Sequence, residues 1–364
     1  MTTFAEIVPN RCWPVREWPV QDQAAWAAAF EPGDALEPGG IAARWAPTTC
    51  CMIENGYGRW LAWLAASNLF DPDELPAQRV TEARVAAYAA KLGDTTAPFS
   101  VQSRVRQLGS ALRAMVPHGD WRWILRGADR IRARAVPVRD KRARLQSPER
   151  LVQLGLQIMA QAEAATDGRT VWCAADYRDG LIIALLAHRP IRARNLCMIQ
   201  CRRQLVQRNG VWWLVFSSDQ TKTSRPIEMP FPAELAFNLE RYLATHRPVL
   251  LEVGQRHKRP RTDALWVSSV GRAMHYASIS FQVRHRTAAA FGRALSPHIF
   301  RDCAATSIAI MDPEHVRMIP PILGHAGLAT SERHYNQARS LEAGRRYQQT
   351  IAELRRRVVT QASA

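Results

Sequence analysis

The chain has 364 residues, enough for two domains of ordinary size, and its 47% hydrophobic residues indicate a globular protein with a sizeable core. Its net charge of +17 predicts a polyanionic partner. Nucleic acid is the first candidate, because Lys and Arg neutralise phosphates. Seven cysteines without paired metal-ligand spacing argue against a disulfide framework and a zinc site, and no apolar run is long enough to span a bilayer, so we expect a cytoplasmic protein without membrane contact.

The charge is unevenly distributed along the chain. Residues 1–100 carry seven Lys and Arg against twelve Asp and Glu, whereas residues 101–364 carry 42 against 20. An Arg-rich proteome would raise the total in the same way. The uneven distribution instead predicts a basic surface that begins after the first hundred residues.

The first third of the chain predicts an arm followed by helices. Residues 1–44 are rich in Pro, Trp and Gly and lack a sustained period, which predicts an irregular arm with one short helix near residues 23–30. After Pro47 three helical patterns follow, the second starting after Thr81, a good N-cap, and the third near Ser100. We therefore expect residues 45–135 to form a small all-helical domain.

Basic residues then accumulate. Arg104 and Arg106 lie off the apolar stripe of the third helix, where they would face phosphates or simply solvent. Residues 122–150 are dense in Arg and cannot build a core of their own, which predicts a linker over residues 136–147 lying along DNA. Its basic residues, expected to contact phosphates, are Arg139, Lys141, Arg142 and Arg144.

The second half predicts a helical domain with one small antiparallel sheet. Residues 151–160 and 177–187 show helical patterns, the second hydrophobic enough to be buried. Strands at 204–208 and 211–216 flank Asn209-Gly210, a dipeptide typical of a type I′ hairpin turn, and a third strand is expected at 226–230. Helices return from residue 279 to the end. The predicted fold class is mainly α with a small antiparallel β-sheet.

Two short motifs in this half contain basic residues suited to binding a phosphate. Arg192 follows the buried helix and precedes Asn195 and Leu196. Lys222 lies in the turn before the third strand. Taken singly, an Arg-rich turn and a solvated turn lysine are common, so neither motif alone predicts a function.

Two further motifs add histidines and a tyrosine. Ser296 and Pro297 start a helix that carries His298 and Arg301, three apart and therefore on one face. Leu323-Gly324-His325 precedes Tyr335 by one short helix. A chance His and Arg pair or a buried Tyr is common, so these motifs gain weight only from their order along the chain.

The order of the four motifs resembles that of the tyrosine recombinases of the phage-integrase family. The resemblance covers residues 148–340 well and residues 45–135 more loosely. It implies a helical core-binding (SAM-like) domain over 45–135, a catalytic domain with a C-terminal helix over 148–364, and site-specific DNA recombination. The family often has Glu or Asp where this chain has Asn195, and commonly nine residues from the motif His to the Tyr where this chain has ten.

The resemblance implies that three residues bind the scissile phosphate. Arg192 and Arg301 would hold it from two sides, because a guanidinium presents a planar fork of donors. His325 would donate a third hydrogen bond.

The resemblance also implies how covalent bonds and protons move. Tyr335 would attack the phosphorus to give a 3′-phosphotyrosine and a free 5′-hydroxyl, with His298 as base. Lys222 would protonate the leaving oxygen. No cofactor and no metal are expected, because arginines take the place of divalent cations.

The expected partner is a double-stranded DNA target site, with the protein a monomer in solution and a homo-tetramer on DNA. An apolar stripe over residues 341–358 would dock into a neighbouring subunit or complete the chain's own core. Two alternatives stay open: a type IB topoisomerase-like enzyme, and a catalytically decayed accessory DNA-binding protein.

Overall fold

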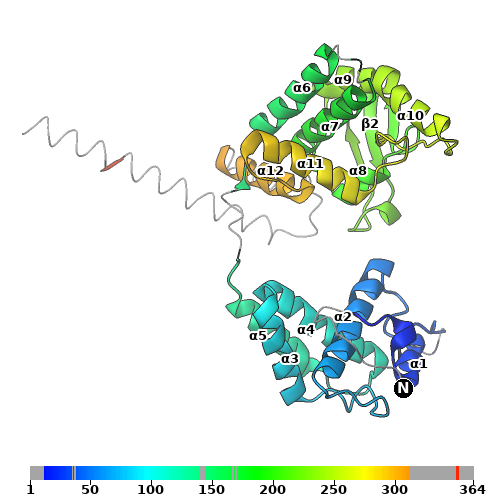
Figure 1. The fold of residues 1–364 in the computed structure, drawn as a ribbon, viewed down its shortest axis with the longest axis vertical. Helices are drawn as coiled ribbons and strands as arrows, with labels where there is room; N and C mark the ends of the chain where they lie inside the picture. The colour runs from blue at the N-terminus through cyan, green and yellow to red at the C-terminus, as the bar shows by residue number, and fades with distance from the viewer. Residues whose placement is uncertain are drawn as a thin grey trace, which may run out of the picture. The chain divides into compact units, whose positions relative to one another are not determined.

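The computed structural model divides into two compact units, Met1–Asp140 and Lys141–Ala364 (Figure 1). The boundary falls inside the basic segment 136–147. No helix in the described ranges combines the length and the apolarity needed to cross a membrane. The structure describes residues 12–34, 36, 38–138, 144–165, 168, 170–311 and 350–351.

The first unit is a set of helices around an aromatic core. The Thr81 hydroxyl accepts a hydrogen bond from the Arg84 amide at 3.2 Å, so this residue caps α3 as predicted. The buried residues of α2 include Tyr57, Trp60 and Leu61, which confirms the helical pattern after Pro47. The helices are α1 (Val20–Ala28), α2 (Pro47–Ala66), α3 (Glu82–Thr95), α4 (Pro98–Met115) and α5 (Arg122–Arg134).

Within the described part of the expected arm, the short helix predicted near residues 23–30 is present as α1, but the segment around it packs into the first unit. Trp18 and Trp26 are buried in the core of the first unit, and Trp18 meets Tyr57 of α2 edge to face. Asp22 of α1 is fully buried and accepts two hydrogen bonds from Arg79, at 2.6 and 2.8 Å. Because a buried carboxylate needs such a partner, α1 is part of this unit's core.

The Arg-rich stretch after residue 122 begins with a helix that belongs to the first unit. This helix, α5, lies within the range 45–135 predicted to be helical, packs along α4, and buries Ile124 and Ala128 beneath its exposed arginines. The Arg-rich composition conceals this narrow apolar face.

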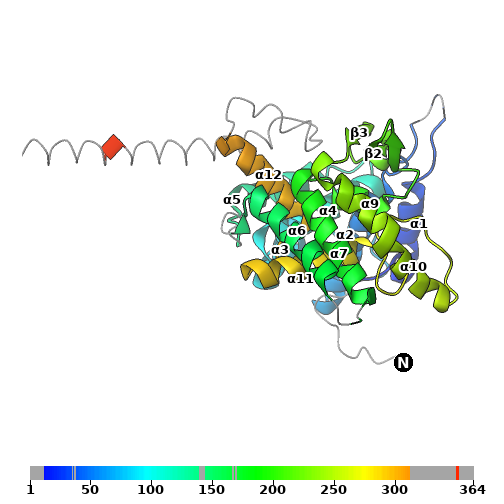
Figure 2. The same ribbon diagram turned by 90° about the horizontal axis from the view of Figure 1, so that it is seen from above.

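The second unit is built around α7 (Thr170–His188), whose residues are buried almost continuously from Tyr177 to Leu186. Helix α6 (Pro148–Ala164) packs against it (Figures 1 and 2). The two helices approach most closely where Gly155 faces Gly180. A Cβ added at either glycine would lie 2.6 Å from the carbonyl oxygen of the other. The two backbones can approach this closely only because both positions lack a side chain.

The small sheet has the predicted form. Strands β1 (Leu205–Arg208), β2 (Val211–Phe216) and β3 (Ile227–Pro230) pair antiparallel in the order β1-β2-β3. Asn209 and Gly210 both have positive φ, at 49° and 77°, as a type I′ turn requires. The sheet lies beside the helices, and Leu214 and Phe216 point into their core.

The rest of the unit is helical, so the fold is mainly α with one small antiparallel sheet, as the sequence predicts. A π-helical turn, Tyr242–His246, joins two helices that the sequence pattern did not predict. The elements are α8 (Ala193–Met198), η3 (Ser218–Gln220), η4 (Ala233–Leu235), α9 (Ala236–Arg241), α10 (Arg247–Arg256), α11 (Tyr276–Phe291) and α12 (Pro297–Met311).

Candidate active site

Arg192 occupies the N-cap position of α8, just after the end of α7. The last residue of α7, His188, lies with its Nδ1 3.0 Å from the Ala184 carbonyl and its Nε2 2.7 Å from Glu234, so the helix end is fixed to η4. Ile191 and Leu196 are buried on either side of Arg192. Burial lowers the pKa of Arg192, which shows that its guanidinium lies partly out of water.

Arg301 lies in the second turn of α12 and is buried. Its Nη1 donates a 2.6 Å hydrogen bond to the carbonyl of Pro190, two residues before Arg192. Burial, and then the nearby charge of Arg192, lowers the pKa of Arg301 to about 10. At neutral pH Arg301 therefore stays charged.

The two arginines are a candidate site for an anion. Two like charges held close together in a partly buried place repel each other, and an anion between them would remove that repulsion. The planar donors of a guanidinium suit a phosphate. The pair of Arg192 and Arg301 is called the arginine pair below.

His298 lies in the first turn of α12, on its solvent-exposed side, whereas Arg301 three residues later is buried. The shared helix brings the two residues within one turn of each other. The sequence predicted that His298 and Arg301 share one face of the helix, whereas in the structure one is exposed and the other is buried.

Lys222 is exposed in the turn between η3 and β3. The turn is closed by Thr221, whose hydroxyl accepts from the Arg225 amide at 3.1 Å and donates to the Arg225 carbonyl at 2.7 Å. The preceding carbonyl, of Gln220, accepts a hydrogen bond from Asn195 of α8 at 3.2 Å. The base of the lysine turn is therefore attached to the helix that Arg192 caps.

Five of the predicted site residues lie outside the described residues, namely Arg139, Lys141, Arg142, His325 and Tyr335. Their places in the site stay predictions.

The three predicted DNA-binding arginines that the structure does describe have protein neighbours. Arg106 forms an ion pair with Asp129 of α5, and the Arg144 guanidinium donates to the Ala294 carbonyl. Arg104 is half-buried on α4, near Tyr88. Arg144 thus fastens the chain between the units to the loop between α11 and α12.

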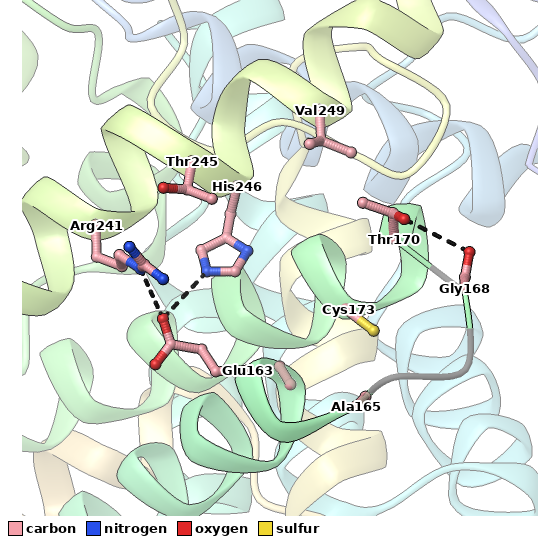
Figure 3. A pocket seen from close by; sticks show the side chains of 10 residues that line it. Glu163, Ala165, Gly168, Thr170, Cys173, Arg241, Thr245, His246 and Val249 are labelled. Carbon is pink, nitrogen blue, oxygen red and sulfur yellow. Dashed lines mark hydrogen bonds and ion pairs between the residues drawn. The ribbon is translucent and has the colours of Figure 1, made fainter.

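The second unit also has a surface hollow of about 360 Å³ that the sequence did not point to (Figure 3). Glu163 accepts a 2.8 Å hydrogen bond from Arg241, and its Oε1 lies 3.7 Å from His246 Nε2. The His246 ring stacks on Tyr177 with centroids 3.9 Å apart. Cys173, which lines the hollow, is 15 residues from the end of α7, about 22 Å along a helix, so the hollow is separate from the arginine pair.

The sequence reasoning missed the backbone partners of the site. The carbonyls of Pro190 and Gln220 hold Arg301 and Asn195, but every residue has a carbonyl, so no residue type signals them. The one available signal was Asn195 itself, an amide where an acid was expected.

Comparison with solved structures finds XerH, a site-specific recombinase. One structure is its pre-cleavage complex with difH substrate, at 15% identity, covering 82% of this chain and 78% of that chain with a TM-score of 0.52. The other is its post-cleavage complex with palindromic difH, at 15% identity and the same coverage, with a TM-score of 0.54. A scan against family models found no match, and neither did a sequence comparison with curated proteins. The chain therefore has the fold seen in XerH, in agreement with the fold that the motif order implies.

Proposed function

We propose that this protein is a site-specific recombinase that cuts and rejoins double-stranded DNA through a 3′-phosphotyrosyl intermediate on Tyr335. The observation that carries the proposal is the arginine pair. Its two guanidiniums come from separate segments, are both at least partly buried, and lie close enough for the charge of Arg192 to lower the pKa of Arg301. A phosphodiester is the anion that such a pair suits, and the +17 charge of the chain favours a nucleic acid as its source.

In this proposal the arginine pair stabilises the charge that develops on the non-bridging oxygens of the scissile phosphate. Preorganised donors are effective because they need no reorientation during the reaction. The hydrogen bond to Pro190 supplies that preorganisation for Arg301. His325 adds a third donor.

Proton transfer accompanies attack and departure. His298 takes the proton of the Tyr335 hydroxyl as its oxygen bonds to phosphorus, and Lys222 gives a proton to the 5′-oxygen as that bond breaks. The phosphotyrosine conserves the energy of the phosphodiester. Attack by a 5′-hydroxyl reverses the step and rejoins the DNA without ATP.

The test is to trap the covalent complex on nicked duplexes that tile the DNA flanking the protein's own gene. The nick lets the short fragment that carries the new 5′-hydroxyl diffuse away, so religation is blocked, and the accumulated phosphotyrosine is seen as a shift on a denaturing gel. The wild type and Tyr347→Phe are expected to form the complex, whereas Tyr335→Phe binds DNA and forms none. A covalent complex that persists in Tyr335→Phe and disappears in Tyr347→Phe would contradict the assignment.

Two further outcomes separate the alternatives. Relaxation of a supercoiled plasmid that lacks the cleaved site would favour a type IB topoisomerase. Binding to DNA without any covalent complex in the wild type would favour an accessory DNA-binding protein.

We further propose that four copies assemble on two DNA sites through the stripe over residues 341–358, most of which lies outside the described residues. Ile351, a stripe residue that is described, is 39% exposed, which supports a role in docking. A chain truncated before Leu341 is expected to fold and bind a half-site but to lose cooperative assembly on paired sites, measured by native gel shift. Unfolding of the truncated chain would assign the stripe to its own core, and intact cooperativity would contradict the docking.

A further inference from the structure

Asn195 holds the turn that carries Lys222. This residue is the third of α8 and is 3% exposed. Its Nδ2 donates a 3.2 Å hydrogen bond to the Gln220 carbonyl and lies 3.8 Å from the sulfur of Met198. The partner oxygen is a backbone acceptor, so the amide nitrogen rather than the amide oxygen must face it.

Gln220 is itself fixed from the sheet side. Its side-chain oxygen accepts hydrogen bonds from the Ser217 amide at 3.3 Å and from Gln204 Nε2 at 3.4 Å. Gln204 is buried at the start of the hairpin. The residue before the lysine turn is therefore held by the sheet on one side and by Asn195 on the other.

The hydrogen bond joins the two halves of the site. Arg192 caps α8 three residues before Asn195, and Lys222 follows Gln220 by two residues, with the buried Thr221 between them. A change in this one bond would therefore alter where Lys222 stands relative to Arg192. The side chain of Lys222 is exposed, so the position of the turn's base determines where it can reach.

The chemistry of this bond requires a donor at position 195. An ionised Asp or Glu has only acceptors and would place an oxygen against the oxygen of Gln220, with no solvent to separate them. We infer that Asn195 is a positioning residue that places Lys222 for proton transfer to the leaving oxygen, and that an acidic residue here would undo this placement. The inference rests on the proposed function, in which Lys222 is the general acid.

The test uses the leaving group. Single-turnover cleavage is measured on the duplex that the wild type cleaves and on the same duplex with a 5′-bridging sulfur at the scissile bond. A thiolate leaves without a proton, so a defect in the general acid disappears with the sulfur substrate. Asn195→Asp and Asn195→Ala should slow cleavage of the ordinary duplex roughly tenfold or more, a part of what a general acid contributes, and cleave the sulfur duplex at nearly the wild-type rate.

Two control variants bracket the result. Lys222→Ala should show the same rescue by sulfur, and Arg192→Ala should stay slow on both duplexes, because the charge on the non-bridging oxygens does not depend on the leaving atom. The inference is overturned when both Asn195 variants are as slow on sulfur as on oxygen, or when Asn195→Asp cleaves the ordinary duplex normally.

A measurement without DNA separates this inference from the proposed function. The Arg225 amide is bonded to the Thr221 hydroxyl, so its hydrogen exchange reports on the turn, and the Val215 amide, bonded to the Gln204 carbonyl, reports on the sheet. Both Asn195 variants should speed exchange in peptides covering residues 220–225 several-fold and leave the peptide around Val215 unchanged. Unchanged exchange in the turn would overturn the tether, whereas a wild type that cleaves no DNA would overturn only the proposed function.

Discussion

The Arg301 side chain has two features that matter for the proposed site. It donates a hydrogen bond to the Pro190 carbonyl, and it carries a positive charge near that of Arg192. A lysine has one nitrogen and cannot reproduce that fork. Arg301→Lys is therefore expected to slow single-turnover cleavage nearly as much as Arg301→Ala, by roughly 100-fold.

The control is Arg208→Lys, which changes an exposed arginine of β1 that pairs with Glu228. This variant should cleave normally. Cleavage near the wild-type rate by Arg301→Lys would mean that a positive charge at this position suffices and that the guanidinium fork is not required.

His246 predicts a dependence of stability on pH. Burial lowers its pKa and the Arg241 charge acts in the same direction, while Glu163 opposes both. Tyr177 covers the ring face. The folded state therefore binds a proton at His246 less readily than the unfolded state does. The contribution of neutral His246 to the free energy of unfolding is fully present above the unfolded pKa of about 6.5 and is lost as the pH falls below that value.

Urea unfolding at pH 8 and pH 5.5 measures this effect. The wild type should lose more free energy of unfolding between the two pH values than His246→Phe, which keeps the stack on Tyr177 and cannot take up a proton. His257→Phe changes an exposed histidine and should behave as the wild type does. Equal losses in the wild type and His246→Phe would refute the prediction.

The sequence indicates which side chains carry chemistry but not what holds them. Motif order singled out Arg192 and Arg301 because an arginine suits a phosphate and the order of such residues can be compared along a chain. The carbonyls that position them leave no trace in a pattern of residue types. Asn195 shows the same limit, since only the structure reveals that its partner is an acceptor.

At the scale of elements, two effects on stability oppose each other when a glycine at the contact of α6 and α7 is changed to alanine. Alanine normally stabilises a helix by about 1 kcal/mol relative to glycine. At Gly155, however, an added Cβ would lie 2.6 Å from the Gly180 oxygen and 2.8 Å from the Ala184 Cβ. Because helix backbones cannot give way cheaply, Gly155→Ala should lower the free energy of unfolding by roughly 1–3 kcal/mol.

Gly127 in α5 provides the matched control. A Cβ there would meet only the end of the Arg130 side chain, at 3.9 Å. Gly127→Ala should therefore stabilise its unit by up to about 1 kcal/mol. Thermal unfolding of both variants decides the sign, and a stabilised Gly155→Ala would show that the two helices can separate without cost.

The elements that the sequence predicted correctly depend on local signals. The hairpin follows from Asn209-Gly210, and the start of α3 follows from Thr81. The features that the sequence did not predict depend on contacts between distant residues. Helix α1 belongs to the core because Asp22 binds Arg79, which lies 57 residues away. Helix α5 buries only two residues, and the arginines around them hide this short apolar face when the segment is judged by its composition.

At the scale of the whole molecule, the positive charge predicts how DNA binding responds to salt. Removing a basic side chain that binds a phosphate should reduce the slope of log affinity against log salt by about one unit. Changing Arg139, Lys141 and Arg142 to Gln should therefore lower the slope by up to about three units. Arg144 is left intact because it donates to the Ala294 carbonyl.

The control changes three exposed basic residues of the acidic first hundred, Arg16, Arg44 and Lys91, to Gln. Both triple variants lose the same net charge, so a difference in slope between them reports contact rather than overall charge. Equal slopes would show that the segment between the units does not touch DNA.

The two ends of the hydrogen bond from Arg301 to Pro190 respond differently to mutation. Its acceptor is a main-chain oxygen, so it survives any substitution of the side chain at position 190 that keeps the local backbone. Its donor is a single guanidinium, so one codon change at position 301 removes both the bond and the charge. The hydrogen bond thus constrains the residue type at position 301 but not at position 190, and a comparison of related sequences would detect only one end of this interaction.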